Sequence, residues 1–312
     1  MAQYLVTGGA GFIGSHLCRR LLAEGHAVRI LDDLSSGRRE NLVEIESEVE
    51  MVAGDLRDEA LLDDALGGVE YVLHHAAVAS VQVSIERPLF EQEVNAVGTL
   101  RLFEAARRAA VHRVVFAASA AAYGNNPTVP KRENMLPEPE SPYAISKVVG
   151  EYYARVYSQI HGLEVVCLRY FNVFGPRQDP FSPYSGVISI FAECMLQGAA
   201  PTIFGDGGQS RDFVYVDNVV EANMKACTTP GIAGRGYNIG CGRSASILDL
   251  VAALNQVLGT ALEPVFEPAR SGDVRVSLAD ITRAREELAY EPMVHFAEGL
   301  EQTIAWMKSV GG

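Results

Sequence analysis

Residues 3–14, QYLVTGGAGFIG, decide the fold of this chain of 312 residues. The stretch runs from a short apolar strand through a glycine turn into a helix. Gly8, Gly11 and Gly14 follow the spacing G-x-x-G-x-x-G: the first permits a tight turn, the second lets the backbone approach a phosphate, and the third lets the helix pack closely on the strand. The helix N-terminus adds free N–H groups and a partial positive charge, which suit a pyrophosphate.

An acidic residue follows where a dinucleotide site requires one. The apolar strand 27–31 ends in Asp32, 18 residues beyond Gly14, and a carboxylate there can accept hydrogen bonds from the adenosine ribose hydroxyls. The same charge would repel a ribose phosphate, so the sequence favours NAD over NADP. Arg38 and Arg39, just beyond, leave NADP open as an alternative.

Strands and helices alternate through the first half of the chain. Short apolar runs predict strands at 49–52, 70–74, 113–117 and 164–169, and apolar residues at helical spacing predict helices at 12–24, 58–66, 88–110 and 144–161. Continuous apolar strands of this kind are typical of a parallel sheet covered on both faces. Right-handed crossovers then give an α/β fold with a doubly wound parallel (Rossmann) sheet.

The pattern changes near Gly175, where loops rich in Gly, Pro, Ser and Asp separate shorter elements. We expect residues 1–175 to form an NAD-binding Rossmann domain. The strand-like run 236–240 is expected to return to the main sheet, so a segment near 213–242 rejoins that domain. The remainder of 176–312 is then a smaller, interleaved α/β substrate-binding domain.

Composition narrows the possible partners and location. The net charge of −13 argues against nucleic acid or an anionic membrane as a partner, and no apolar run reaches the length of about 18 residues that a membrane span needs. Five scattered cysteines, with no C-x-x-C pair, predict reduced thiols and no structural metal site. A first strand that begins two residues after Met1 leaves no room for a signal peptide, so we expect a cytoplasmic protein.

Three residues have the chemistry of a proton-transfer site. Tyr143 and Lys147 form Tyr-x-x-x-Lys near the start of a predicted helix, and this spacing puts both on one helical face. A nearby ammonium, helped by a cationic nicotinamide ring, is expected to lower the tyrosine pKa from about 10. Ser119 ends the preceding strand, at the edge where open α/β sheets bind ligands. The alternative of a solvated helix face is outweighed by the glycine turn upstream.

Four motifs together resemble the extended short-chain dehydrogenase/reductases, and within them the UDP-hexose 4-epimerases. These are T-G-G-A-G-F-I-G (7–14), S-A-A-A-Y-G (119–124), Y-A-I-S-K (143–147) and R-Y-F-N-V-F-G (169–175). The resemblance implies an NAD-dependent isomerase that inverts carbon 4 of a UDP-sugar through a transient 4-keto sugar. Tyr143 would be the acid/base, Lys147 would hold the nicotinamide ribose, and Ser119 would orient the sugar hydroxyl.

The same resemblance, with the strand ends, assigns the other contacts. Asp55 is placed to hydrogen-bond the adenine, while Asn95 and Tyr170 match positions near the nicotinamide. Cofactor contacts are expected from Gly8, Gly11, Phe12, Ile13, Gly14, Asp32, Asp55, Leu56, Asn95, Tyr143, Lys147 and Tyr170. Substrate contacts are expected from Ser119, Tyr143, Asn172, Thr202, Phe204, Arg211, Arg270, Asp273 and Ser277, with the two arginines clamping the diphosphate.

Departures from the family pattern leave the sugar open. Ser277 replaces a bulky tyrosine of the glucose/galactose-restricted epimerases, which favours UDP-N-acetylglucosamine and UDP-N-acetylgalactosamine alongside UDP-glucose and UDP-galactose. Ala120 and Ala121 replace hydroxyl residues beside Ser119, which puts rate and preference in doubt. Without acidic residues at 120–122, dehydratase and decarboxylase chemistry lacks its acid/base.

The sequence is also compatible with two other functions, and the resemblance carries an expectation about assembly. A UDP-glucuronate 4-epimerase or another nucleotide-sugar enzyme of this family is the alternative substrate class, and a non-catalytic NAD sensor would have no use for the serine, tyrosine and lysine. The resemblance also implies a homodimer formed through two long helices, for which 88–110 and 144–161 are the candidates.

Overall fold

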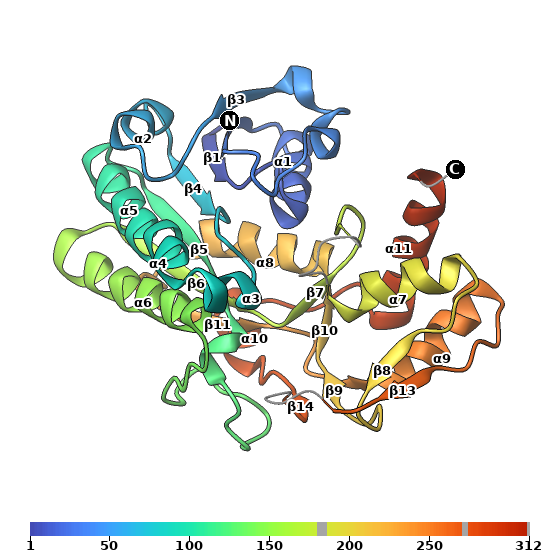
Figure 1. Ribbon diagram of the computed structural model, residues 1–312. Coiled ribbons are helices and arrows are strands. Elements are labelled where there is room, and N and C mark those ends of the chain that lie inside the picture. The colour runs from blue at the N-terminus through green and yellow to red at the C-terminus, as the bar shows by residue number, and fades with distance from the viewer. Residues whose placement is uncertain (180–185, 270–273, 311–312) are drawn as a thin grey trace.

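The computed structural model describes residues 1–179, 186–269 and 274–310, and a seven-stranded parallel sheet forms its centre (Figure 1). The strand order is β11-β6-β5-β4-β1-β2-β3, which confirms the doubly wound α/β fold. The strands are β1 Gln3–Thr7, β2 Ala27–Asp32, β3 Val49–Ala53, β4 Tyr71–His74, β5 Arg113–Ser119, β6 Glu164–Tyr170 and β11 Gly236–Ile239. Because all seven strands are parallel, their carboxyl ends meet at one edge.

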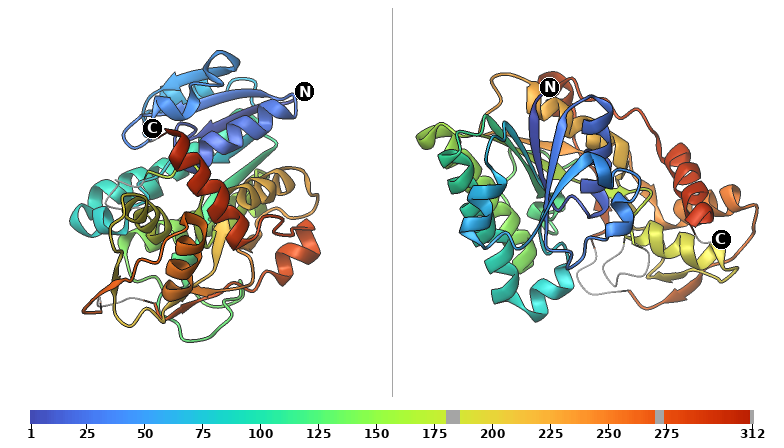
Figure 2. Two further views of the ribbon diagram at one scale, coloured as in Figure 1. Left: turned by 90° about the vertical axis from the view of Figure 1, so that its right-hand side faces the viewer. Right: turned by 90° about the horizontal axis from the view of Figure 1, so that it is seen from above.

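Helices cover both faces of this sheet, as the view from above in Figure 2 makes clear. The helices of one face are α1 Phe12–Ala23, α8 Val216–Thr228 and α10 Thr282–Leu288; those of the other are α2 Glu59–Ala65, α5 Gly98–Arg108 and α6 Pro142–Val156. Each face has its own cluster of buried apolar side chains, which explains why the strands read as continuous apolar runs.

Two predicted helices are interrupted. The helix expected at 88–110 is divided into α4 Pro88–Gln92, the π-helical turn η3 Glu93–Val97, and α5. Within η3, the Asn95 side chain accepts a hydrogen bond from Val78 N (2.8 Å) and donates one to Val78 O (3.0 Å), so a tertiary contact accompanies the break. The helix expected at 144–161 likewise ends as α6, followed by the π-helical turn η5 Tyr157–His161.

Short elements fill the remaining chain. The helix α3 Val81–Glu86 was not expected from the sequence. Ser80 precedes it as the N-cap, and its hydroxyl accepts a hydrogen bond from Val83 N. The 3-10 turns are η1 Arg39–Leu42, η2 Glu46–Glu48 and η4 Ala120–Tyr123.

A second group of elements packs beyond the carboxyl edge of the sheet. Its strands pair as β7 Asn172–Phe174 with β10 Phe213–Tyr215 and as β8 Thr202–Phe204 with β13 Val265–Glu267. A third sheet has β9 Ser210–Arg211 at its centre, between β12 Ala245–Ser246 and β14 Val276–Ser277. Its helices are α7 Val187–Leu196, α9 Ile247–Leu258 and α11 Phe296–Val310, which share a third apolar cluster. The strand expected near 236–240 is β11, beside β6; the division into two domains stays a prediction. Within the described ranges, no helix is both long and apolar enough to cross a membrane.

Candidate active site

The glycine turn between β1 and α1 is crowded by backbone. Gly8 has φ +70° and its N–H donates to Leu31 O at 2.8 Å. A Cβ on Gly14 would lie 2.1 Å from Gly8 O, and a Cβ on Gly8 would lie 2.7 Å from Ala76 N. Gly11 caps α1 without a side chain, so backbone N–H groups face the turn. These residues therefore fit the pyrophosphate of a dinucleotide.

The carboxylate of Asp32, at the end of β2, connects the glycine turn to the loop that follows β2. Its Oδ2 accepts from Ala10 N at 2.9 Å and its Oδ1 accepts from Leu34 N at 2.8 Å. Burial raises the pKa of Asp32, and these two hydrogen bonds oppose the shift. Each oxygen keeps acceptor capacity for a ribose hydroxyl, as the NAD prediction requires.

Other predicted cofactor residues lie around the same edge. Phe12 and Ile13 open α1 and are partly buried against the third apolar cluster. Asp55 follows β3, where Arg57 holds it through a 2.6 Å ion pair, and Leu56 beside it is buried. The expected contact between Asp55 and the adenine stays a prediction.

The structure brings Ser119, Tyr143 and Lys147 together. Ser119 is the last residue of β5, and its hydroxyl lies close enough to the Tyr143 phenol to lower the pKa of that phenol. Ser141 caps α6 by accepting from Ala144 N (3.2 Å), which places Tyr143 in the first turn. One turn later, Lys147 Nζ donates to Ala117 O at 2.9 Å and lies 5.8 Å from the centre of the Tyr143 ring.

In the protein alone, the pKa of Tyr143 is raised rather than lowered, so the predicted lowering depends on the cationic nicotinamide and stays a prediction. Burial raises the pKa of Tyr143, the nearby Ser119 hydroxyl lowers it, and the charge of Glu91 raises it further. Burial also lowers the pKa of Lys147 to about 8, although the charge of Glu91 opposes that shift. The loss of hydration therefore dominates the pKa of Tyr143, and the Lys147 ammonium donates to the backbone carbonyl of Ala117.

Tyr170 belongs to a buried network that includes two residues missed in the sequence. Tyr170 pairs with Ser119 in the register of β5 and β6. Its hydroxyl lies 2.9 Å from His75 Nε2 and accepts from Asn223 Nδ2 at 2.8 Å. The ring of His75 stacks on that of Tyr170, with centroids 5.8 Å apart. The position of His75, directly after β4 at the ligand-binding edge, is a signal that could have identified it.

Asp212 is another residue that the sequence did not point to, and it contacts two residues that are expected to bind the substrate, Asn172 and Ser277. Its buried carboxylate accepts from the N–H groups of Cys241 (2.7 Å), Gly242 (3.0 Å) and Ala279 (3.1 Å). Its backbone O accepts from Asn172 N (3.1 Å), and its N–H donates to Ser277 O (2.7 Å).

The substrate residues of β9 and β14 lie beside Asp212. Ser277 is paired with Arg211 in the register of these strands. The Arg211 guanidinium donates to the backbone carbonyls of Ser210 (2.9 Å) and Val274 (2.6 Å). Thr202 is exposed and Phe204 is partly buried on β8. Arg270 and Asp273 lie outside the described residues.

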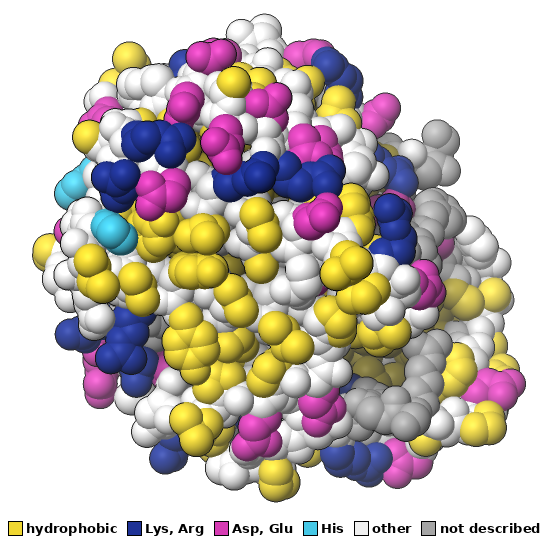
Figure 3. Space-filling view, turned by 60° about the vertical axis from the view of Figure 1, so that its left-hand side comes forward, with side chains coloured by type: hydrophobic (Ala, Val, Ile, Leu, Met, Phe, Trp, Pro, Cys, Tyr) yellow, Lys and Arg dark blue, Asp and Glu magenta, His cyan; other side chains and the backbone are white. Residues whose placement is uncertain are grey.

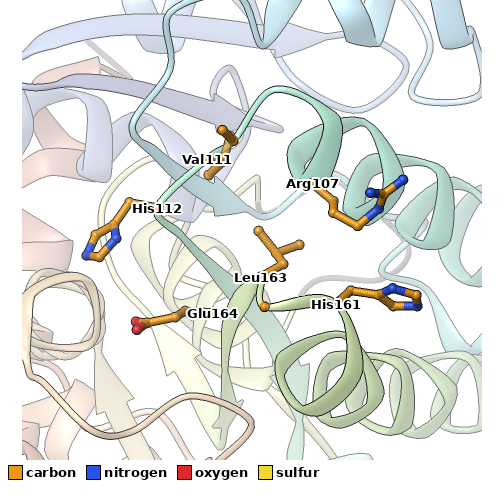
Figure 4. Close-up of a pocket in the computed structure, with 8 residues that line it drawn as sticks. Arg107, Val111, His112, His161, Leu163 and Glu164 are labelled. Carbon is orange, nitrogen blue, oxygen red and sulfur yellow. The ribbon is translucent and has the colours of Figure 1, made fainter.

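A pocket of about 300 Å³ lies at the opposite end of the strands (Figure 4). It is lined by Arg107, His112, His161 and Glu164, where β5 and β6 begin. Ser119 and Tyr170 mark the other ends of these two strands. The pocket is therefore separate from the candidate site, which follows the rule that open α/β sheets bind ligands at the carboxyl edge.

Known proteins that are similar to this chain belong to a family that fits this site. Residues 4–240 match the model of the NAD dependent epimerase/dehydratase family. A UDP-glucose 4-epimerase of Mycolicibacterium smegmatis is 45% identical over 310 residues, or 98% of both chains. The structure of a Thermotoga maritima UDP-glucose 4-epimerase with UDP-glucose superposes with a TM-score of 0.94 at 40% identity, covering 99% of this chain and 100% of that one.

A second solved structure carries a different sugar. The UDP-N-acetylglucosamine 4-epimerase of Methanobrevibacter ruminantium M1, in complex with UDP-N-acetylmuramic acid, superposes with a TM-score of 0.95 at 38% identity, covering 99% of both chains. The predictions of the family and of NAD as cofactor are confirmed. The chain belongs to the NAD dependent epimerase/dehydratase family.

Proposed function

We propose that this protein is an isomerase that inverts carbon 4 of a UDP-hexose with the aid of NAD. The observation that carries the proposal is the group formed by Ser119, Tyr143 and Lys147 at the carboxyl edge of the sheet that also bears the glycine turn. A serine and a lysine beside one phenol suit proton transfer at a sugar hydroxyl. The epimerases similar over nearly the whole chain support the same activity.

The protein's own groups have distinct tasks in this reaction. Tyr143 would take the proton from the 4-hydroxyl as a phenolate, a form that the positive charge of a bound nicotinamide would favour, and would return it, while Ser119 would orient that hydroxyl. Lys147, protonated below its pKa of about 8, supplies the positive charge beside the phenol. The glycine turn and Asp32 would hold NAD, which supplies a hydride acceptor and donor for carbon 4 when bound.

For the sugar, we propose acceptance of UDP-N-acetylglucosamine as well as UDP-glucose. Ser277 is a small residue on β14, paired with Arg211, the proposed diphosphate ligand. A serine leaves room that a tyrosine would fill, and an N-acetyl group needs that room. The similarity to epimerases of both sugar classes supports this proposal.

We also propose a homodimer formed through α6 and its neighbours. Exposed apolar residues of α6 and η5 recur at helical spacing, and α4 adds one more: Ile145, Tyr152, Val156, Ile160 and Leu89. Figure 3 shows hydrophobic side chains gathered in a band on this side of the molecule. Such a band fits a partner surface. Ile160→Glu with Tyr152→Glu should give a monomer by light scattering, and an unchanged mass would contradict this interface.

Product analysis tests the activity. The protein is incubated separately with UDP-glucose, UDP-N-acetylglucosamine and UDP-glucuronate, and 4-epimers are resolved by NMR. We expect epimers of the first two sugars. Conversion of UDP-glucuronate alone would select the other substrate class, and no conversion of any UDP-hexose would contradict the activity.

A further inference from the structure

We propose that Glu91 is a positioning residue of this active site: it fixes the first turn of α6 and places a buried negative charge against Tyr143 and Lys147. The inference rests on the proposed function, because it assigns a task to a residue behind the catalytic pair. Glu91 is the fourth residue of α4 and is 0% exposed. A fully buried glutamate is uncommon unless it is paired or fully hydrogen-bonded.

Three side chains donate to this carboxylate. Ser146 Oγ lies 2.6 Å from Oε1, Gln92 Nε2 lies 2.7 Å from Oε2, and Asn95 Nδ2 also donates to Oε1. The amide orientations are fixed by backbone partners: Gln92 Nε2 donates to Pro142 O at 2.8 Å, and Asn95 Oδ1 accepts from Val78 N at 2.8 Å. An ionised carboxylate, which only accepts, is the form that matches three donors.

These hydrogen bonds connect α4 directly to the catalytic helix. Ser146 lies between Tyr143 and Lys147 on α6, and its hydroxyl is also 2.9 Å from Tyr143 O. Gln92 contacts Pro142 O, immediately before Tyr143. Glu91 therefore anchors the turn that carries the phenol from two sides. Loss of this anchor is expected to displace the phenol from Ser119, and small displacements of reacting groups are costly.

The negative charge itself acts on the pair. The charge of Glu91 raises the pKa values of both Tyr143 and Lys147, in each case secondary to burial. His74, the last residue of β4, and His75, directly after it, also lie near the ammonium, and burial keeps the pKa of each histidine below its usual value. With both imidazoles neutral, Glu91 is the charged group that balances Lys147 within the described part of this cluster. It keeps the buried lysine protonated near neutral pH.

The pH profile of Glu91→Gln separates this role from simple support of the fold. Removing the charge should lower the pKa values of both Tyr143 and Lys147, so the acidic and alkaline limbs of the activity profile should both move to lower pH. We expect the maximal kcat to fall about tenfold. The control is Glu86→Gln, at an exposed glutamate of α3 that accepts from Gln82, and it should match the wild type.

A second variant tests position without removing the charge. Glu91→Asp keeps the charge but withdraws the oxygens from Ser146, so kcat should fall while both limbs stay in place. A wild-type kcat in Glu91→Asp would overturn the positioning role, and this variant serves even where Glu91→Gln does not fold. Lower activity of Glu91→Gln with unmoved limbs would overturn the role of the charge.

A readout without turnover separates this inference from the proposed function. Ultraviolet difference spectra of each protein against its Tyr143→Phe counterpart report the titration of the Tyr143 phenol. The phenolate should form at lower pH in Glu91→Gln than in the wild type. If no UDP-hexose is epimerised, the proposed function fails, while the shifted titration still supports Glu91; an unshifted titration overturns the inference whatever the activity.

Discussion

The two sides of the candidate site are held in different ways. Ser119, Tyr143 and Lys147 lie on a seven-residue strand and a fifteen-residue helix, and their contacts run to one another and to buried backbone. Arg211 and Ser277 lie on strands of two residues each, beside Asp212, whose backbone N–H donates to Ser277 O. The proton-transfer groups are thus built on long, buried elements, whereas the groups expected to recognise the substrate lie on short strands.

This difference suggests a division of work between the two sides. A reacting phenol tolerates little displacement, so long elements suit it. Recognition of different sugars can change by substitution on short strands without disturbing the sheet. Mutations on the first side should therefore act mainly on kcat, and those on the second mainly on KM or on the choice of sugar.

Tyr143→Phe should have the largest effect, because it removes the group that moves the proton. We expect kcat to fall about a thousandfold, with little change in NAD content or melting temperature. Steady-state kinetics and the absorbance of released cofactor measure these quantities. Tyr153→Phe, at a partly buried tyrosine of the same helix outside the proposed dimer surface, is the control. Normal turnover by Tyr143→Phe would show that another group is the acid/base.

Arg211→Gln should raise KM for the UDP-sugar about thirtyfold, which corresponds to about 2 kcal/mol for a hydrogen bond to a charged group. The physical reason is loss of the guanidinium that is expected to bind the diphosphate. kcat should change much less. Arg235→Gln, at an arginine paired with Glu287 before β11 and at the other edge of the sheet, is the matched control. A fall in kcat at unchanged KM would contradict the division between the two sides.

Ser277→Tyr should reduce kcat/KM for UDP-N-acetylglucosamine about tenfold relative to UDP-glucose, because the phenol would fill the room that an N-acetyl group needs. Parallel assays with the two sugars give the ratio, and Ser277→Ala serves as the small-residue control. An equal loss on both sugars would remove the argument from pocket size.

The pH dependence of the wild type should show the smallest change, about a factor of two. Burial lowers the pKa of Lys147 from 10.5 to about 8, so the protonated form is lost as pH rises through 8 rather than through 10.5. If protonated Lys147 supports turnover, kcat should be halved near pH 8. A constant kcat up to pH 10 would separate the charge of Lys147 from the reaction.

Local sequence patterns were sufficient to predict the side of the site that carries Ser119, Tyr143 and Lys147. The glycine turn, the acid at the end of β2 and the Tyr-x-x-x-Lys spacing are all short-range signals, and they specify an α/β sheet with a dinucleotide site. Contacts between distant residues were not accessible in this way. The Asp212 carboxylate accepts hydrogen bonds from Cys241 and Ala279, which are 29 and 67 positions away in the sequence. No local pattern around Asp212 predicts these partners.

The same limit explains the interrupted helix and the tyrosine pKa. Apolar spacing over 88–110 fits one continuous helix, and the π-helical turn accompanies a contact between Asn95 and Val78 that spacing cannot reveal. The shifted pKa of Tyr143 depends on burial and on Glu91, which approaches from another helix. The sequence spacing predicts that Lys147 lies beside the phenol. It does not reveal how much hydration the phenol loses on burial, which is the largest cause of its raised pKa.

Transfer of deuterium at carbon 4 tests the central claim most directly. The wild-type protein is incubated with UDP-glucose deuterated at carbon 4, and the product is analysed by NMR and mass spectrometry. The account predicts UDP-galactose that retains the deuterium at carbon 4, because the hydride leaves and returns within one site. Product that has exchanged this deuterium for solvent hydrogen, or the absence of a 4-epimer from any UDP-hexose, would contradict the account.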